Sequence, residues 1–100
     1  MSFNGSNNQG ATLDLPLTPI ANARTDFTQI MNNYRAGGGT PITESLDEAL
    51  RYLRGDEVKY GASGVKSAMN PALTQYKKPI KNQCQKNHVI LFSDGDPSVD

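Results

Sequence analysis

Tryptophan is absent from this sequence, cysteine and histidine each occur once, and ten basic residues are balanced by ten acidic ones. A formal net charge of zero gives no reason to expect that the chain as a whole binds nucleic acid or a membrane surface. No apolar run approaches the roughly 18 residues of a membrane-spanning helix. The first residues, Met1 to Asn4, lack the basic and apolar regions of a signal peptide. We therefore expect no nucleic-acid partner, no membrane insertion by this segment and no signal peptide in it.

Apolar residues are also scarce, at 36% of 100 residues, beside nine glycines and six prolines. This composition allows at most one small domain and favours a loop-rich domain or a fragment of one. The single Cys84 is either a buried thiol or half of a disulfide whose partner lies outside these residues. His88 has no cysteine or histidine at ligand spacing, so a structural role is favoured. The lysines between residues 77 and 86 lack the surrounding motif of a nucleic-acid patch, which favours a solvated loop.

The first half of the chain predicts a loop and then a helix. Residues 5–23 are rich in Asn, Gly, Thr and Pro, which predicts a surface loop. Over residues 24–35 the apolar residues recur at helical spacing and predict one apolar face: Phe27, Ile30, Met31 and Tyr34. The glycines at 37–39 are predicted to end this helix.

The clearest local pattern predicts a helix over residues 41–54. Thr40 suits the N-cap, Pro41 the first helical position and Gly55 the position after the last turn. Acidic residues occupy its first half and arginines its end, as the helix dipole favours. An apolar stripe is predicted to face the core: Ile42, Leu46, Ala49, Leu50 and Leu53.

The second half is predicted to be mostly irregular. Residues 56–86 show no sustained periodicity and predict a long loop, with a short helix near 71–76; loops of this length are uncommon and often functional. The apolar run from Val89 to Phe92 does not alternate, which predicts a strand covered on both faces, as in a parallel sheet. Helices with such a strand indicate an α/β layer.

Two oxygen-bearing residues lie where such a layer binds ligands. Asp94 directly follows the predicted strand, at the edge where ligands bind in α/β sheets, and Thr40 heads a helix behind three glycines. A carboxylate and a hydroxyl suit a hard divalent cation such as Mg²⁺ more than zinc. Each residue also has an ordinary alternative, Thr40 as an N-cap and Asp94 as a turn residue before Gly95.

Alternating oxygen donors at Asp94, Asp96, Ser98 and Asp100 raise the separate possibility of a calcium-binding loop. The EF-hand pattern requires glycine at its sixth position, where this chain has Val99, and an acidic residue at its twelfth. We therefore favour supporting roles for Asp96 and Ser98, as hydrogen-bond partners of the ligands or of solvent.

The motifs "GGGTPITESLDEAL" and "VILFSDGDPS" together resemble the von Willebrand factor type A domain. The chain is more similar still to the A-type domain of tip-associated biogenesis and adhesion proteins of bacterial type IV pili. Their patterns "GGTP…ES…EA.RY..G" and "Y..PI...CQKN..IL..DG.P" match from Gly38 to Gly55 and from Tyr76 to Pro97, and "MSFNG" resembles the tail of a preceding strand. The resemblance implies that residues 1–100 are a partial, Rossmann-like α/β domain. It would have a parallel sheet with flanking helices, and about 56–86 would be a long loop or insertion.

The resemblance also implies a site. In that family the two matching residues, Thr40 and Asp94, belong to a metal-ion-dependent adhesion site that holds Mg²⁺ or Ca²⁺. The Asp-x-Ser-x-Ser loop that begins the family's site does not precede Thr40, so we expect an internal fragment that binds metal weakly. A disulfide between Cys84 and a cysteine outside the chain becomes plausible in an exported protein.

The function implied is adhesion and pilus assembly at the cell surface or pilus tip. A carboxylate from a minor pilus subunit or from a host or surface protein would complete the coordination of the metal. The alternative is an A-type interaction module of a cytoplasmic assembly or chelatase-type complex. An enzyme is not favoured, because the sequence offers no base-and-nucleophile constellation and "GGGTP" lacks the lysine of a phosphate-binding loop.

Overall fold

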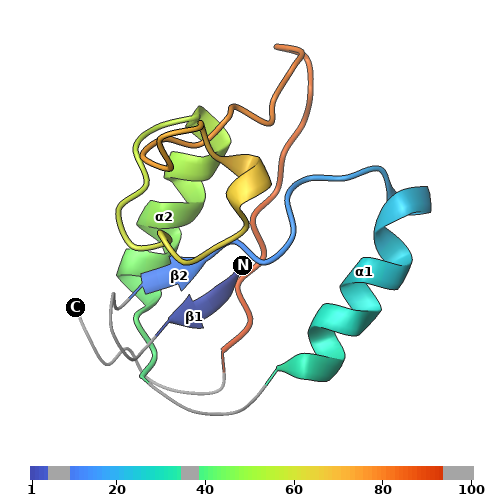
Figure 1. Cartoon of the computed structure of the whole chain (residues 1–100), viewed down its shortest axis with the longest axis vertical. Coiled ribbons are helices and arrows are strands. Elements are labelled where there is room, and N and C mark those ends of the chain that lie inside the picture. The colour runs from blue at the N-terminus through green and yellow to red at the C-terminus, as the bar shows by residue number, and fades with distance from the viewer. Residues whose placement is uncertain (5–9, 35–38, 94–100) are drawn as a thin grey trace.

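The computed structural model of this chain describes residues 1–4, 10–34 and 39–93. They form a small mixed α/β unit with extents of 35 × 28 × 26 Å (Figure 1). The elements in chain order are β1 (Ser2–Asn4), β2 (Gly10–Thr12), α1 (Ile20–Asn33), α2 (Ile42–Arg54) and one turn of 3-10 helix, η1 (Lys66–Ala68). None of the helices in these ranges has the length and apolarity needed to cross a membrane.

The sheet is an antiparallel pair. Phe3 of β1 lies opposite Ala11 of β2, so a strand does occur at the "MSFNG" start. The prediction of a surface loop over 5–23 is wrong for β2 and the residue after it, because Ala11 and Leu13 are only 2% and 3% exposed. Their two-residue spacing is a strand signal, but glycine and asparagine around them hide it. The described residues contain no parallel strand pair.

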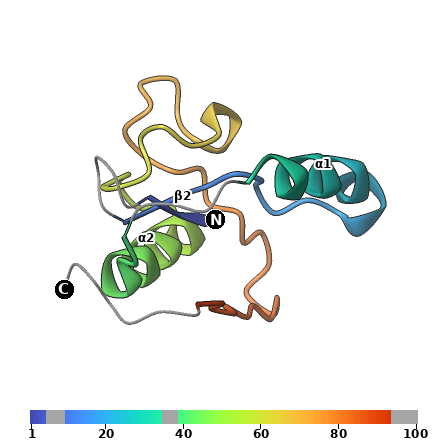
Figure 2. The ribbon, with the colours of Figure 1, turned by 90° about the horizontal axis from the view of Figure 1, so that it is seen from below.

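Helix α1 begins earlier than predicted and is poorly covered. It starts after Pro19 and ends at Asn33. Its predicted apolar face is largely exposed, Phe27 at 55% and Met31 at 47%, and Ala23 is the buried residue of the helix. Two views show α1 lying to one side of the sheet and α2 (Figures 1 and 2). The residue after α1 contacts the segment that follows β2, because the Tyr34 hydroxyl donates to an Asp14 carboxylate oxygen at 2.8 Å.

Helix α2 ends at the predicted residue and begins one residue later than predicted. Gly55 follows it in the left-handed conformation, with φ of 73°, as expected of a glycine at this position. The N-cap is Pro41, so the prediction of Thr40 as N-cap is wrong. The cause is local: Ile42 N–H donates to the Thr40 carbonyl at 3.0 Å, while Pro41 has φ −80° and ψ 78°. This is an inverse γ-turn, which keeps Pro41 out of the helix.

The buried face of α2 is not the apolar stripe. Leu46 and Leu50 are 39% and 46% exposed, whereas Ser45, Glu48 and Tyr52 are buried. Residues 45, 48 and 52 lie on one side of a helix, and strand β2 packs against α2. The prediction failed because the two polar side chains on this side find hydrogen-bond partners far away in sequence.

The predicted insertion supplies much of the core. Residues 56–86 are mainly irregular, as predicted, but the helix expected near 71–76 is replaced by a turn and two bridges, Glu57 with Gln75 and Met69 with Tyr76. Asn70 stabilises the turn, its side-chain oxygen accepting from the N–H of Thr74 and Gln75. The core cluster draws on the residue after β2, on α2 and on this segment: Leu13, Tyr52, Ala68, Met69 and Tyr76.

The apolar run before the acidic residues forms no described strand. Val89, Ile90, Leu91 and Phe92 are 51%, 77%, 43% and 87% exposed. They pair with no strand of the described ranges, so the predicted burial on both faces is wrong for the part of the chain that the structure describes. Exposure follows because neither a neighbouring strand nor a covering helix from these ranges lies over them.

Candidate functional site

Thr40 lies two residues before α2, ahead of the N-cap Pro41, and is partly buried. Its carbonyl is engaged by Ile42 N–H. The other predicted ligand, Asp94, lies outside the described residues, as do Asp96 and Ser98. The structure therefore describes one of the two predicted ligands, and the metal site stays a prediction.

Glu44, in the first turn of α2, is a candidate that the sequence reasoning missed. Its Oε2 atom is buried and has no hydrogen-bond partner among the described residues. Buried carboxylate oxygens normally have partners, and a hard cation is one kind of partner such an atom accepts. From the sequence alone, Glu44 is only one of the acids that the helix dipole favours, because its burial depends on packing. No group of three or more His, Cys, Asp or Glu in the described ranges is arranged to hold a metal.

Ser45 fastens the start of α2 to the sheet. Its hydroxyl lies 3.0 Å from the Gly10 carbonyl oxygen and 2.6 Å from the Pro41 carbonyl oxygen, and the side chain is buried. The first contact joins β2 to α2 across 35 residues of sequence. This bond positions the helix end that carries Thr40 and Glu44.

Glu48 is the most enclosed charged residue among those described, with an exposed fraction of 0%. Its carboxylate accepts hydrogen bonds from the backbone N–H groups of Lys59 (3.2 Å), Tyr60 (3.0 Å) and Gly61 (3.1 Å). The Tyr76 hydroxyl also donates to it. We call these four donors around one carboxylate the Glu48 anchor; charged acceptors make such bonds about twice as strong as neutral ones.

The anchor explains two neighbouring features. A Cβ on Gly61 would lie 2.5 Å from the Tyr76 hydroxyl oxygen and 2.9 Å from a Glu48 oxygen, so only glycine brings its N–H this close. Burial, and then the hydrogen bond to Glu48, raise the pKa of Tyr76 well above its usual value. The Glu48 anchor is thus a structural clamp that holds the 57–61 loop against α2.

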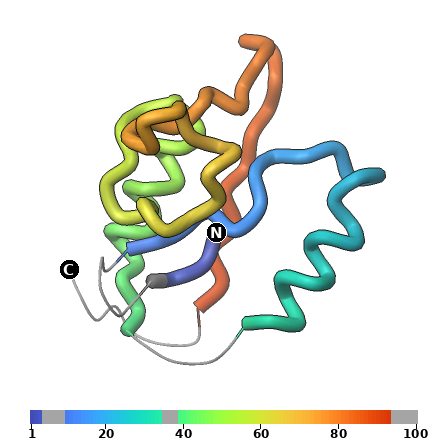
Figure 3. The backbone as a smooth tube through the Cα atoms, viewed as in Figure 1, coloured from blue at the N-terminus to red at the C-terminus, as the bar shows by residue number. Residues whose placement is uncertain are grey.

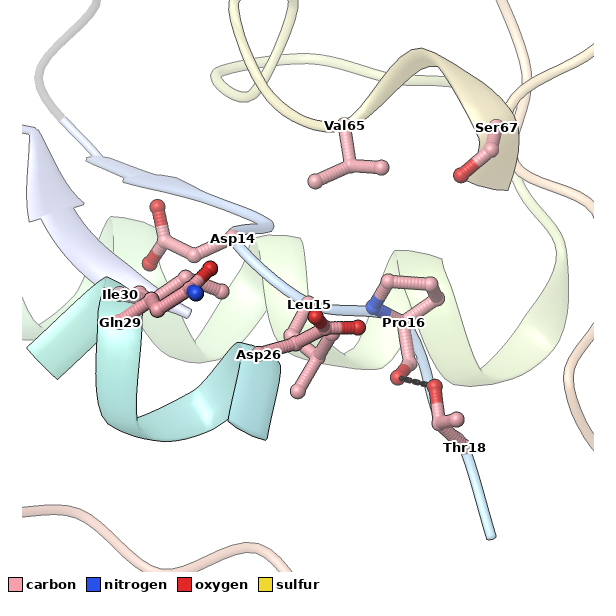
Figure 4. A pocket seen from close by; sticks show the side chains of 9 residues that line it. All are labelled: Asp14, Leu15, Pro16, Thr18, Asp26, Gln29, Ile30, Val65 and Ser67. Atoms are coloured by element: carbon pink, nitrogen blue, oxygen red, sulfur yellow. Dashed lines mark hydrogen bonds between the residues drawn. The ribbon is translucent and has the colours of Figure 1, made fainter. Parts of the chain in front are cut away.

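A separate cleft of about 400 Å³, with polar and apolar side chains in its lining, lies between α1 and η1 with the residue before it (Figure 4). Asp14, Asp26, Gln29 and Ser67 give it its polar character. Asp14 is engaged by Tyr34, whose pKa is raised to about 12, first by burial and then by this hydrogen bond. Of the predicted site residues within the described ranges, neither Thr40 nor Cys84 lines the cleft.

Cys84 lies on a projecting loop. The segment around residues 80–86 extends away from the rest of the unit (Figure 3), and Cys84 is exposed as a free thiol. The lysines of this stretch are exposed, and none of them makes an ion pair within the described ranges: Lys77, Lys78, Lys81 and Lys86. Their exposure is that of a solvated loop.

The class defined by these observations is a small mixed α/β unit with one buried carboxylate clamp and one helix end bearing oxygen donors. No known family model, no curated protein and no solved structure matches the chain.

Proposed function

We propose that the chain is part of a von Willebrand factor type A domain with a parallel, Rossmann-like sheet. It would act as a non-catalytic interaction module in a tip-associated biogenesis or adhesion protein of type IV pili. The resemblance of the "GGTP" and "DG.P" motifs supports the proposal. So does the agreement between the helix that the motif implies and α2, which runs from Ile42 to Arg54 and is closed by Gly55.

The proposed mechanism is metal ligation by Thr40 and Asp94. Mg²⁺, or Ca²⁺ in its place, would supply an open coordination position for an oxygen of the partner. The positive end of the α2 dipole opposes a cation, so a carboxylate is needed beside the Thr40 hydroxyl to offset it. The observation that carries this proposal is the buried, unpaired carboxylate oxygen of Glu44 in the first turn behind Thr40. Asp96 and Ser98 would support the ligands through hydrogen bonds.

The partner proposed is a carboxylate-bearing protein, either a minor pilus subunit or a host or surface protein. In this setting the domain would lie at the cell surface or pilus tip. Cys84 is exposed and free within this chain, which leaves its sulfur accessible to a cysteine outside the chain.

An NMR titration of the isotope-labelled chain with MgCl₂ and then CaCl₂ tests the site. We expect saturable shifts of the amides from Thr40 to Glu44, with a dissociation constant on the order of 10⁻³ M, because few protein ligands leave the ion mostly hydrated. Thr40→Ala, Glu44→Gln and Asp94→Asn should abolish the shifts. The controls Thr43→Ala and Asp56→Asn change exposed residues of the same types, one in the first turn of α2 and one beyond its C-terminal end, and should leave the shifts intact.

Absence of shifts near Thr40, or shifts that persist in Asp94→Asn, would contradict the proposed ligands. A micromolar dissociation constant would instead contradict the expectation that this segment binds metal weakly.

A further inference from the structure

An apolar hollow of about 520 Å³ lies between β1, α1, α2 and the last described segment. Phe3 contributes from the sheet, Phe27 and Met31 from α1, Leu46 from α2, and Val89–Phe92 from the opposite wall. Figure 2 shows that last segment separated from β1 and β2. Side chains of the two predicted apolar helix faces and of the predicted apolar strand therefore line one hollow, and the fold leaves them exposed there.

The walls of this hollow carry backbone hydrogen-bonding groups that no strand of the described ranges pairs. Strand β1 pairs only with β2 among the described strands. The residue after β2 is engaged on another side, because Val65 N–H donates to the Leu13 carbonyl at 2.8 Å. Residues 88–92 make no backbone hydrogen bond to any described residue. A β1 edge and a strand-forming apolar segment thus line the same hollow, each with backbone donors and acceptors that no described strand pairs.

We propose that this hollow is a docking site for one β-strand of a partner polypeptide, apolar on both faces. The strand would hydrogen-bond to the free edge of β1 on one side and to Val89–Phe92 on the other. Addition of a strand satisfies exposed backbone groups while pockets along the groove select the side chains. The chemistry of the walls argues for such an occupant, because a helix or a small apolar molecule would leave both backbone edges unpaired.

The exposed area agrees with a specific interface. The large apolar side chains that α1, α2 and the last segment place on these walls are 39% to 87% exposed: Phe27, Met31, Leu46 and Val89–Phe92. At roughly 150–200 Å² for a fully exposed side chain of this size, they present about 700 Å². That is close to the ~800 Å² that each partner buries in an interface of standard size, and apolar patches beyond a few hundred Å² mark interaction sites.

A second copy of the chain fits this site less well. Its own strand-forming segment, Val89–Phe92, already forms a wall of its own hollow. Two copies could therefore pair only edge to edge along these segments, and both hollows would stay open. A separate strand fills the space and uses both edges.

A fluorescent synthetic peptide with the sequence of residues 87–93 and two lysines at each end is a suitable probe, because it is apolar on both faces and strand-forming. Anisotropy is measured with the whole chain in EDTA, so that the result is independent of the proposed metal site. We expect saturable binding with a dissociation constant on the order of 10⁻⁵ to 10⁻⁴ M. Methylation of alternate peptide nitrogens should weaken binding at least about tenfold, because it removes donors and keeps the side chains. Amide exchange should slow at residues 2–4 and 89–92.

The matched variants are Leu46→Glu, on the wall of the hollow, and Leu50→Glu, one turn further along α2 and similarly exposed but not on the wall. Both should keep the wild-type circular dichroism, and only Leu46→Glu should lose binding. Three results would overturn the proposal: no saturable binding, binding that N-methylation does not weaken, or a stable dimer in sedimentation that protects residues 89–92.

Discussion

Replacing Glu48 by glutamine tests whether the Glu48 anchor holds the fold together. The carboxylate is fully buried and accepts three backbone N–H groups and one hydroxyl. Glutamine has nearly the same shape, but one acceptor oxygen becomes an NH₂ group that faces other donors. At least one buried N–H or O–H group then loses its acceptor, and the remaining bonds lose their charge.

The size of the effect follows from these contacts. A hydrogen bond to a charged group contributes about 1.5–3 kcal/mol, and a buried donor left unsatisfied costs about 1–3 kcal/mol. We expect Glu48→Gln to lower the free energy of unfolding by about 2–4 kcal/mol. Tyr76→Phe removes a single donor and should cost about 1–2 kcal/mol. Glu57→Gln is the control, because the same chemical change at an exposed position should stay within about 0.5 kcal/mol.

Urea unfolding followed by far-ultraviolet circular dichroism measures these differences as shifts in midpoint at constant slope. A Glu48→Gln midpoint equal to that of Glu57→Gln would refute the reasoning. It would mean that the 57–61 loop is held by the packing of Tyr52 and Tyr76, whose rings meet edge to face at 5.5 Å, and not by the carboxylate.

Two further predictions concern a cap and a tyrosine. Gly55→Ala should lower the free energy of unfolding by about 1–2 kcal/mol, because φ is 73° and the new Cβ would lie 2.9 Å from Lys78 Cβ; an unchanged urea midpoint would contradict this. Because burial and the bond to Asp14 raise the pKa of Tyr34 from 10.0 to about 12, the folded state favours the protonated phenol. The contribution of Tyr34 to the free energy of unfolding is therefore complete below pH 10 and is lost as the pH rises through about 12. Ultraviolet titration of the folded chain at 295 nm should show one fewer late-ionising tyrosine in Tyr34→Phe than in the wild type.

Local signals in the sequence predicted the helices and strands better than they predicted which residues are in contact. Helix α2 was predictable because Pro41 and Gly55 determine where a helix begins and ends through the backbone of the residues next to them. Its buried side was not, because Ser45 and Glu48 become core residues only through partners in β2 and in the 59–61 loop. The Val89 to Phe92 run gave a strand signal, yet a strand also needs a neighbour, and no described segment pairs with it.

The candidate site shows the same division. Thr40 could be predicted from the motif around it, since its position ahead of a helix is a local property. Glu44 could not, because an acid in a first helical turn usually faces water, and only packing makes one of its oxygens buried and unpaired. Asp94 lies outside the described residues and stays a prediction.

Helix α2 therefore has two faces with different tasks. One face is clamped inside the unit by Ser45 and Glu48, and the other presents Leu46 to the apolar hollow. If these tasks are separate, Glu48→Gln should lower stability but leave peptide affinity per folded molecule unchanged. Leu46→Glu should do the opposite, because it removes no buried contact of the core cluster. Coupling of the two effects in the double variant beyond about 0.5 kcal/mol would contradict this separation, since independent sites add within that margin.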